Sequence, residues 1–379
     1  MPNFTFKTRQ EIEDFIRGAT FYGTGGGGDP VLGASMMNTL LEEGVAFGWV
    51  DPREVGEDVA TASVFGMGST APRTPAVCRQ MGKYGLNPNQ PLLSRKEYII
   101  GALEQLENYV GKQVGALVPI ELGGGNSPSA MVAAASKGIV MVDGDYAGRA
   151  VPEMCQTTVF LKNRMSLPMA SCDCWGDRCV YLSAVNWPMV ERMGKMFSVA
   201  GFGPCGMAGH WLSGKQMQDT VVPGTMTQCL EMGRLIREAR EAGDDPVQAI
   251  AKDTGGWVLG RGVVSKREWE DRDGYFWGFH TIDGHGAYQG TQLRIMFQNE
   301  NHICWQNGKP IATSPDLICV VDDVTGEPYI NTVMKEGMRV AVIGLAAKPV
   351  FRDPDAVAVL GPRCFGLEQE YVPIEALVK

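Results

Sequence analysis

Residues 115–153 read GALVPIELGGGNSPSAMVAAASKGIVMVDGDYAGRAVPE, and this stretch decides the predicted fold. An apolar run ends at Ile120 and is followed by Glu121, three glycines and Asn126. The alanine-rich residues 128–138 have the composition of a helix, and a second apolar run then ends in the acidic sequence DGD. The pattern predicts a strand, a glycine-rich loop, a helix and a second strand parallel to the first.

The ionisable residues of this unit follow the two predicted strands directly. Glu121 comes after the first strand, and Asp143 and Asp145 come after the second. Ligands of open parallel sheets bind beyond the carboxyl ends of the strands. We therefore expect these three acids to face one cleft, where they are the candidates for catalysis.

The N-terminal part of the chain alternates predicted helices and strands. The predicted helices are 8–18, 29–44 and 94–110, and the predicted strands are 45–50 and 58–65. Alternation of this kind is typical of layered α/β structure. It indicates an α/β domain over residues 1–165, with glycine-rich loops and a mostly parallel or mixed sheet covered by helices.

The pattern changes in the second half of the chain, residues 166–379. On either side of this boundary the sequence predicts strands at 157–162 and 180–183, and helices follow at 187–199 and 225–242. Short alternating runs broken by DRDG, DGHG, QNGK and VTGE then predict a β-rich region over 257–350. The last segment, from residue 352, has no obvious repeat and is free to fold back on the first domain.

Composition narrows the classes of partner. The 379 residues carry a formal net charge of −9 and no Lys/Arg stripe, which argues against nucleic acid. No apolar run approaches the ~20 residues that span a bilayer, so no membrane partner is expected. The start, MPNFTFKTRQEIEDFI, lacks the apolar core of a secretory signal. Ten scattered cysteines are typical of reduced side chains, so we expect a cytoplasmic location.

Residues 23–28 form a second glycine-rich run, GTGGGG. It matches the GxGxxG pattern, and Asp51 follows at a plausible spacing, but the preceding segment is helical where a dinucleotide site needs a strand. Two interpretations stay open: a tight turn that lets two helices pack, or backbone N–H groups that bind an anion or a polarised oxygen. The substrate-binding candidates of the two glycine loops are Gly25, Gly26, Gly27, Gly28, Asp29, Gly124 and Asn126.

Asp143, Asp145, Arg149 and Glu153 form the densest group of charged residues. Two acids at a strand end can divide acid and base roles or hold a divalent metal such as zinc or manganese. Arg149 can hold one acid ionised or bind a substrate carboxylate with two hydrogen bonds. The alternative is a salt-bridged loop with a structural role only.

Other metal sites are less favoured. Cys172, Cys174 and Cys179 are spaced C-x-C-x4-C, which is unusual for zinc, and residues 173–178 are better explained as a hairpin turn. The four histidines form no HxH or HExxH pair. His285, in a glycine-rich turn, is the histidine candidate for a metal ligand.

Six motifs follow one another between about residues 10 and 372: YGTGGGGDP, ELGGGNSP, VDGDYAGRAVPE, FQNEN, SPDLICVVD and LGPRCFG. In these motifs the chain resembles the S-methyl-thiohydantoin desulfurase family, a former domain of unknown function often encoded beside hydantoinase- and oxoprolinase-type enzymes. The resemblance implies an α/β domain, a β-rich C-terminal domain and hydrolytic removal of sulfur from a five-membered thiohydantoin-type ring. The residues it implies for the site are Gly25 to Asp29, Glu121, Gly124, Asn126, Asp143, Asp145, Arg149, Glu153, Asn299, Glu300 and Asp316.

One segment departs from the family's pattern. After the glycine turn of the second strand, the family pattern leads to a Glu-Lys pair that follows a proline, whereas this chain reads MGSTAPRTPAVCRQ. Either Arg73 or Arg79 takes that place, or the polar tail of the substrate is bound differently. The cysteine-rich turn at 172–179 is also peculiar to this chain.

Together these observations predict a hydrolase that acts on a small cyclic substrate. Water attacks the ring with help from Asp143, Asp145 and Glu121, or with help from a divalent metal that those aspartates hold. A homo-oligomer or a hydantoinase-like partner is compatible with this prediction. The alternative function is a non-catalytic accessory subunit of a hydantoinase-like system that binds a ligand or a nucleotide.

Overall fold

The protein was analysed as a computed structural model that describes residues 3–69 and 73–378. Within this range the first sheet has eight strands: β1 (Phe4–Thr5), β2 (Gly48–Val50), β3 (Ala60–Met67), β4 (Ala116–Leu117), β5 (Val140–Val142), β7 (Met169–Cys172), β8 (Arg178–Tyr181) and β9 (Cys205–Ser213). They lie in the order β1-β2-β5-β4-β3-β9-β7-β8. The four strands from β2 to β3 in that order are parallel, and the others pair antiparallel. The predicted mixed α/β sheet is confirmed.

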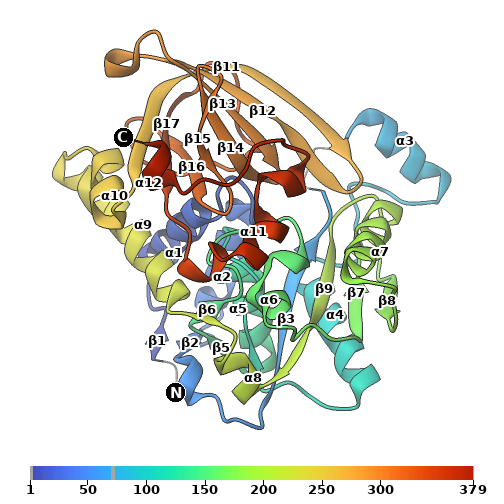
Figure 1. Ribbon diagram of the computed structural model, residues 1–379. Helices are drawn as coiled ribbons and strands as arrows, with labels where there is room; N and C mark the ends of the chain where they lie inside the picture. Colours follow the sequence, from blue (N-terminus) through green and yellow to red (C-terminus); the bar gives the residue numbers. More distant parts are fainter. Residues whose placement is uncertain (1–2, 70–72, 379) are drawn as a thin grey trace.

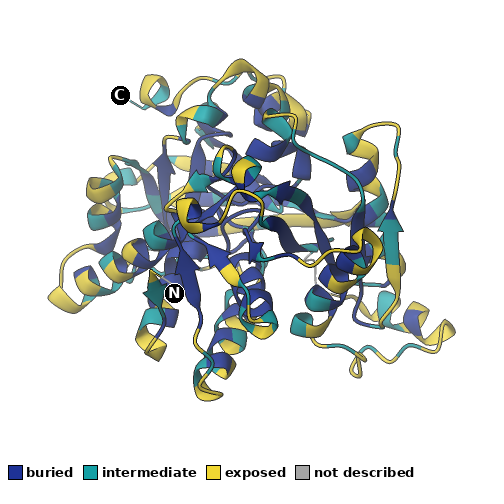
Figure 2. Ribbon diagram, turned by 90° about the horizontal axis from the view of Figure 1, so that it is seen from below, coloured by how far each residue is buried: buried dark blue, intermediate teal, exposed yellow. Residues whose placement is uncertain are grey.

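Helices cover both faces of this sheet. They are α1 (Arg9–Tyr22), α2 (Pro30–Glu42), α4 (Arg95–Val110), α5 (Asn126–Lys137), α7 (Trp187–Ala200) and α8 (Gly214–Gln218), whereas α3 (Pro75–Lys83) stands apart from the sheet (Figure 1). Side chains of β3 alternate between the two faces. Ala62 and Val64 join the core cluster that contains α4 and α5, whereas Phe65 and Met67 join the cluster that contains Val190 of α7. The sheet is buried between them, and yellow exposed residues line the outer helix faces (Figure 2).

Local signals explain where the main helices begin. Thr8 and Glu11 form a capping box at α1, and Ser94 and Glu97 form another at α4. Asp29 caps α2 ahead of Pro30, as the sequence predicts. Because α1 runs directly into the first glycine run, no strand precedes that run, and the strand that a dinucleotide motif needs is absent at this point.

The C-terminal half forms a seven-stranded antiparallel sheet within the described residues. Its strands are β11 (Trp257–Arg272), β12 (Tyr275–Gly284), β13 (Gln292–Gln298), β14 (Glu300–Gln306), β15 (Lys309–Thr313), β16 (Leu317–Asp322) and β17 (Arg339–Leu345). Their order is β15-β14-β13-β12-β11-β17-β16. Figure 1 shows this sheet, in orange, above the N-terminal half, with α1 near β16 between them. The predicted β-rich C-terminal region is confirmed.

The remaining strands and α-helices lie outside the two large sheets. They are β6 (Gly144–Asp145), which pairs with β10 (Val222–Pro223), and the helices α6 (Thr158–Leu161), α9 (Thr225–Ala242), α10 (Pro246–Thr254), α11 (Pro354–Leu360) and α12 (Ile374–Leu377). Gln156 Nε2 donates to the carbonyl oxygen of Val359 at 3.0 Å, so the last segment contacts the N-terminal half. Strands β7, β8 and β9 extend the first sheet past residue 165, where the sequence predicts a domain boundary.

One predicted strand is wrong. Residues 157–162 are rich in β-branched side chains, but the structure has the helical turn α6 there. The N–H and the hydroxyl of Thr158 both donate to the carbonyl oxygen of Tyr146, and Thr157 donates to that of Met154. These tertiary contacts override the local preference for a strand. No helix in the described part of the chain is long and apolar enough to cross a membrane.

Candidate active site

A cavity of about 960 Å³ lies between the two sheets, at the end of β3 and beside α7. Several residues that the sequence singles out line it: Gly25, Gly26, Gly27, Gly28, Asp29, Glu121, Asn126, Glu153, Asn299 and Glu300. Other candidates do not line it: Gly124, Asp143, Asp145, Arg149, His285 and Asp316. The structure therefore brings both glycine runs and the FQNEN motif together, and places the aspartates of the VDGD motif elsewhere.

The two glycine loops pack backbone against backbone. The carbonyl oxygen of Gly27 accepts hydrogen bonds from the N–H groups of Gly125 and Asn126, both at 3.0 Å. A Cβ on Gly123 would overlap the backbone of Gly27, so only glycine fits at this approach. The N–H group of Gly28 donates to no other residue in the described chain, and Gly28 lines the cavity. Close packing thus explains part of the glycine run, and a donor is still available to a ligand.

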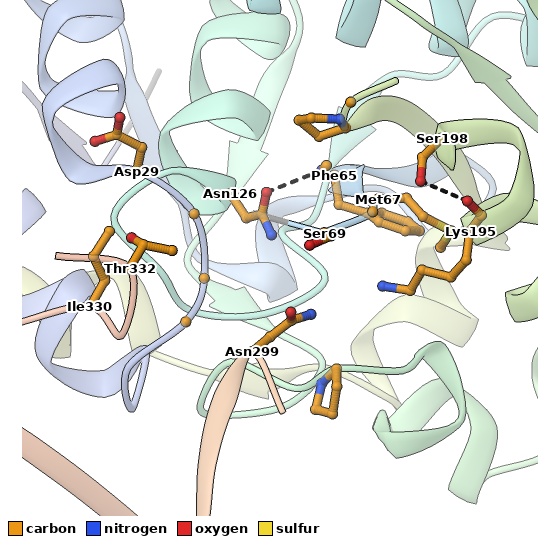
Figure 3. Close-up of a pocket in the computed structure, with 18 of the residues that line it drawn as sticks. Asp29, Phe65, Met67, Ser69, Asn126, Lys195, Ser198, Asn299, Ile330 and Thr332 are labelled. Atoms are coloured by element: carbon orange, nitrogen blue, oxygen red, sulfur yellow. Dashed lines mark hydrogen bonds between the residues drawn. The ribbon is translucent and has the colours of Figure 1, made fainter. Parts of the chain in front are cut away.

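Asn126, the first residue of α5, is held on three sides. Its Nδ2 donates to Glu121 Oε1 at 2.6 Å. Its Oδ1 accepts from the N–H of Gly66 at 3.1 Å and from Nη2 of Arg95 at 2.9 Å. Figure 3 shows the side chain at the cavity wall, with its hydrogen bond to the end of β3 dashed. Asn126 therefore connects Glu121, β3 and α4 by hydrogen bonds along one side of the cavity.

Glu121 follows β4, and its carboxylate is buried with both oxygens hydrogen bonded. Oε2 accepts from the N–H of Val151 at 2.7 Å, opposite the bond from Asn126. Burial raises the pKa of Glu121 above its usual value, and the hydrogen bonds and the charge of Lys195 oppose this shift. A buried carboxyl group with a raised pKa can exchange a proton near neutral pH.

Glu300 enters the same cavity from the C-terminal sheet, at the start of β14. Its Oε1 accepts from the N–H of Gly27 at 3.3 Å, and a Cβ at Gly26 would overlap this carboxylate. Its Oε2 is buried and has no hydrogen-bond partner within the described residues. Burial raises the pKa of Glu300, and the negative charge of Glu121 raises it further, against two nearby positive charges.

Asn299 forms the turn that positions Glu300. Its φ is +57°, in the left-handed region that asparagine tolerates better than most residues. Its Oδ1 accepts from the N–H of Phe276 at 2.9 Å, and its carbonyl oxygen accepts from Nδ2 of Asn331 at 2.9 Å. Figure 3 shows Asn299 at the end of this hairpin, next to the cavity. The turn therefore fixes where the carboxylate of Glu300 lies.

Helix α7 brings two charged residues that sequence reasoning missed. Glu191 and Lys195 are only 3% and 4% exposed, and Lys195 Nζ lies 3.5 Å from Glu191 Oε1. Both line the cavity, and Figure 3 shows Lys195 extending from α7 toward it. The local sequence carries only a weak signal, because both residues fall on the buried side of the helix with Val190 and Gly194 but have the spacing of a surface ion pair. Charged residues on such a face are almost never buried unless they are paired.

Glu153 and Tyr275 close the cavity beside Lys195. The Tyr275 hydroxyl donates to Glu153 Oε1 at 3.3 Å, and the Tyr275 ring centre lies 4.3 Å from Lys195 Nζ. Burial raises the pKa of Glu153, and the charge of Glu191 raises it further. Strand β12 of the C-terminal sheet therefore covers the charged residues of α7.

Asp143 is a helix cap and not a cavity residue. Its Oδ1 accepts from the N–H groups of Met226 and Thr227, and its Oδ2 accepts from the Thr227 hydroxyl at 2.6 Å. It thereby satisfies the first turn of α9, which has no side-chain cap of its own at Gly224. The chain turns after β5 to make this contact. Residues 144–145 therefore do not stay at the edge of the first sheet, where the sequence predicts them.

Asp145 is fully buried in β6, behind the cavity wall. Its Oδ2 accepts from the N–H groups of Ala147 at 2.9 Å and Gly148 at 2.7 Å. The Thr225 hydroxyl and the charge of Lys348 lie close enough to lower its pKa, but burial dominates and raises it to about 7. Asp145 thus organises the loop that leads to Arg149.

Arg149 joins the two halves of the molecule instead of facing a ligand. Its five N–H groups are all taken, by the carbonyl oxygens of Ala150, Pro315, Asp316 and Asn301 and by the Thr24 hydroxyl, at 2.9–3.2 Å. Burial lowers its pKa to about 10, although nearby acids oppose the shift. No N–H group is left for a substrate carboxylate, and the contacts of Arg149 are to carbonyl and hydroxyl oxygens and not to the acids of its own loop.

The metal candidates are not gathered at one place. His285 Nε2 lies 3.1 Å from Asp323 Oδ2 in the C-terminal half. Among residues 3–69 and 73–378 no group of three or more His, Cys, Asp and Glu side chains is arranged to hold a metal ion. The cysteine-rich turn is the predicted hairpin, in which Asp173 Oδ1 accepts from two backbone N–H groups between β7 and β8.

Arg73 and Arg79 behave differently. Arg73 lines the cavity, and its Nε donates to the carbonyl oxygen of Phe202 at 3.0 Å. Arg79 is exposed on α3 and does not line the cavity. Of the two residues named for the departing segment, the structure thus places Arg73 at the site. Residues 70–72 of that segment lie outside the described range.

The fold and the cavity define a two-part protein in which an α/β half and an antiparallel β half enclose an acid-lined site. A family model described as S-Me-THD-like, N-terminal domain, matches residues 10–183, and one described as S-Me-THD-like, C-terminal domain, matches residues 185–374. The chain belongs to the S-Me-THD-like family.

Comparison with solved structures supports the fold. An X-ray structure of a protein from Chromobacterium violaceum is similar to this chain with a TM-score of 0.75 and 20% sequence identity. The similarity covers 98% of this chain and 100% of that one. No curated protein matches the sequence.

Proposed function

We propose that this protein is a hydrolase that removes sulfur, as a thiol or as sulfide, from a five-membered thiohydantoin-type ring and leaves a hydantoin. Membership of the S-Me-THD-like family supports the substrate class. The observation that carries the proposal is the pair Glu121 and Glu300, two buried carboxyl groups with raised pKa values at one cavity. Such groups are suited to proton transfer at neutral pH.

The chemistry defines what the site must supply. The reacting carbon lies between two ring nitrogens and carries the sulfur. Water attacks this carbon, a tetrahedral species forms, and the C–S bond then breaks as a carbonyl forms. The reaction needs a base for water, an acid for the ring nitrogen and donors for the ring oxygen.

Glu121 is the base in this proposal. Its two oxygens are fixed by Asn126 and Val151, so the carboxylate is oriented before substrate binds. Because burial raises its pKa, the group is a stronger base than an exposed glutamate. The proton of the attacking water passes to Glu121.

Glu300 is the acid in this proposal. Its Oε2 has no partner in the described chain, and the charge of Glu121 favours its protonated form. It gives a proton to the ring nitrogen as water adds, and recovers one from the new hydroxyl group as the carbonyl forms. The free N–H of Gly28 and the side chain of Asn299 are placed to hold polar atoms of the ring. The acid–base roles thus move from Asp143 and Asp145 to two glutamates.

The test is turnover of an S-methyl-thiohydantoin by the purified protein, followed as released thiol. The wild-type protein is expected to release thiol and form hydantoin. E121Q and E300Q are expected to lower kcat by about 100-fold or more, because each removes one proton-transfer group. E104Q, on the exposed face of α4, is the matched control and is expected to keep full activity.

Two results would count against the proposal. One is the absence of turnover by the wild-type protein; the other is near-normal turnover by E121Q with an unchanged melting temperature. A thermal-shift screen distinguishes the proposed hydrolase from the alternative, a non-catalytic binding subunit. Stabilisation by nucleotides, and not by hydantoins or thiohydantoins, would favour a binding subunit.

A further inference from the structure

Lys195 is a buried cationic group of the cavity that the acid–base pair leaves unused. Its Nζ lies 3.5 Å from Glu191 Oε1 and 4.3 Å from the centre of the Tyr275 ring. Among the described residues that line the cavity it is the one lysine. An ammonium group has three N–H donors, and these two contacts engage at most two of them. One donor is therefore available to a bound molecule.

The C-terminal sheet holds Lys195 in place. A Cβ at Gly274 would come within 3.0 Å of Lys195 Cβ, so the tip of the β11–β12 hairpin packs on the stem of the side chain. Tyr275 then covers the ammonium group. Ionisable groups from five segments act on it or on its neighbours. They are Glu191 of α7, Glu153 and Glu121 of two loops, Glu300 of β14 and Tyr275 of β12.

The positive charge of Lys195 affects the pKa values of three carboxyl groups that line the cavity. It lowers the pKa values of Glu121, Glu153 and Glu300, in each case against burial. Lys195 therefore acts electrostatically on the carboxyl groups that the proposed function uses, and it lines the same cavity as Glu121 and Glu300.

The departure of sulfur is the step to which the proposed function assigns no proton donor. When the C–S bond breaks, its electron pair stays on sulfur as a thiolate. An alkylthiolate is a poor leaving group unless a proton reaches it as the bond breaks. Glu300 is occupied with the ring nitrogen and the new hydroxyl group at this stage.

We propose, on the basis of the proposed function, that Lys195 is the catalytic acid that protonates the departing sulfur. Its ammonium group gives one proton to sulfur as the C–S bond breaks and the carbonyl forms. The resulting amine takes back the proton that Glu121 received from water. The cycle therefore ends with Lys195, Glu121 and Glu300 in their starting forms and releases one thiol and one hydantoin.

The test compares two leaving groups on the same ring, S-methyl and S-(4-nitrophenyl). A nitrophenylthiolate leaves without a proton, whereas a methylthiolate does not. K195M is expected to lower kcat/KM for the S-methyl substrate by about 100-fold or more, and for the S-nitrophenyl substrate by less than about 5-fold. Added methylammonium is expected to restore part of the S-methyl rate.

A structural role would give a different result. If Lys195 only supports the cavity, K195M loses the same factor with both substrates, and this outcome overturns the proposal. Because K195M leaves Glu191 buried without its partner, the double variant E191Q/K195M repeats the test with both charges removed. K195R keeps a cation but cannot give up a proton, so it is expected to lose about as much S-methyl activity as K195M, and recovery of the S-methyl rate in K195R would overturn the acid role.

Lys137 provides a matched control. It is 17% exposed and forms an ion pair with the buried Glu107 at 2.9 Å, outside the cavity. K137M is expected to keep kcat/KM with both substrates. If the wild-type protein converts neither substrate, the proposed function itself fails, whereas an active wild type with leaving-group-independent loss in K195M overturns only the role of Lys195.

Discussion

At the scale of single residues, the hydrogen-bond partners separate structural charges from charges available for chemistry. Arg149 and Asp143 have the residue types expected of a site, but each is satisfied by the protein itself. Glu300 keeps one buried oxygen without a partner in the described chain. A buried polar atom without a partner is costly, and such atoms gather where a ligand completes the site. This is why Glu300 and not Arg149 carries the proposed chemistry.

Asp145 makes a prediction about stability and pH. Its pKa is about 7 in the folded protein against an ordinary value of 3.8, so the folded state favours its protonated form. The associated stability is complete below pH 3.8 and is lost as the pH rises to about 7. The amide that D145N introduces does not titrate, so the variant is expected to lack this decline in the free energy of unfolding, which amounts to about 3 kcal/mol between pH 5 and pH 8.

The measurement is urea unfolding of the wild-type protein and D145N at pH 5 and pH 8. D145N is expected to lose less stability than the wild type between these values, because Thr225 and the two loop N–H groups can still bond an amide. Equal loss in the two proteins would show that Asp145 does not titrate in this range. D253N, an exposed change on α10, serves as the control.

At the scale of elements, the glycine loops position the acids by contact. Gly27 and Gly123 approach so closely that neither tolerates a Cβ, and Gly26 leaves the space that the Glu300 carboxylate fills. The loops thereby lock the β13–β14 hairpin of one half against the α/β sheet of the other. From the sequence alone, the glycine run at residues 23–28 is compatible with an anion-binding loop and with a packing turn, because glycine is suited to both.

G123A tests this packing directly. Gly123 does not have a positive φ, so the effect of the substitution is steric and not conformational. Overlap with the backbone of Gly27 is expected to cost about 1–3 kcal/mol and to lower Tm by several degrees. G82A on α3, where a Cβ meets nothing within 4 Å, is the control and is expected to be neutral or slightly stabilising. Equal Tm values for the two variants would contradict the packing account.

Helix α7 shows what an element pattern can and cannot reveal. The sequence predicts a helix at 187–199, and the structure has it at Trp187–Ala200. Glu191 and Lys195 are spaced as an ordinary surface ion pair, so the spacing alone did not mark them. Their burial depends on the β11–β12 hairpin, which comes more than seventy residues later and is invisible to local periodicity.

At the scale of the whole molecule, the sequence predicts the architecture better than the site. Alternation and turn signals are local, so the mixed sheet and the β-rich half follow from them. The predicted cleft lined by Glu121, Asp143 and Asp145 depends on contacts between distant segments, which local sequence patterns do not reveal. Glu121 stays at the sheet edge, whereas residues 143–145 turn away because β6 pairs with β10, and that pairing joins segments 77 residues apart. Glu300, which the sequence already names as a candidate through the FQNEN motif, lines the cavity instead.

Incorporation of oxygen from water tests the central claim, hydrolysis at the ring carbon, most directly. The wild-type protein is incubated with an S-methyl-thiohydantoin in water enriched in oxygen-18, and the product is analysed by mass spectrometry. We expect a hydantoin with one heavy oxygen per molecule, formed together with one equivalent of thiol, and loss of this product in E121Q. Thiol release without heavy oxygen in the ring, or no product at all, would contradict the proposed hydrolysis.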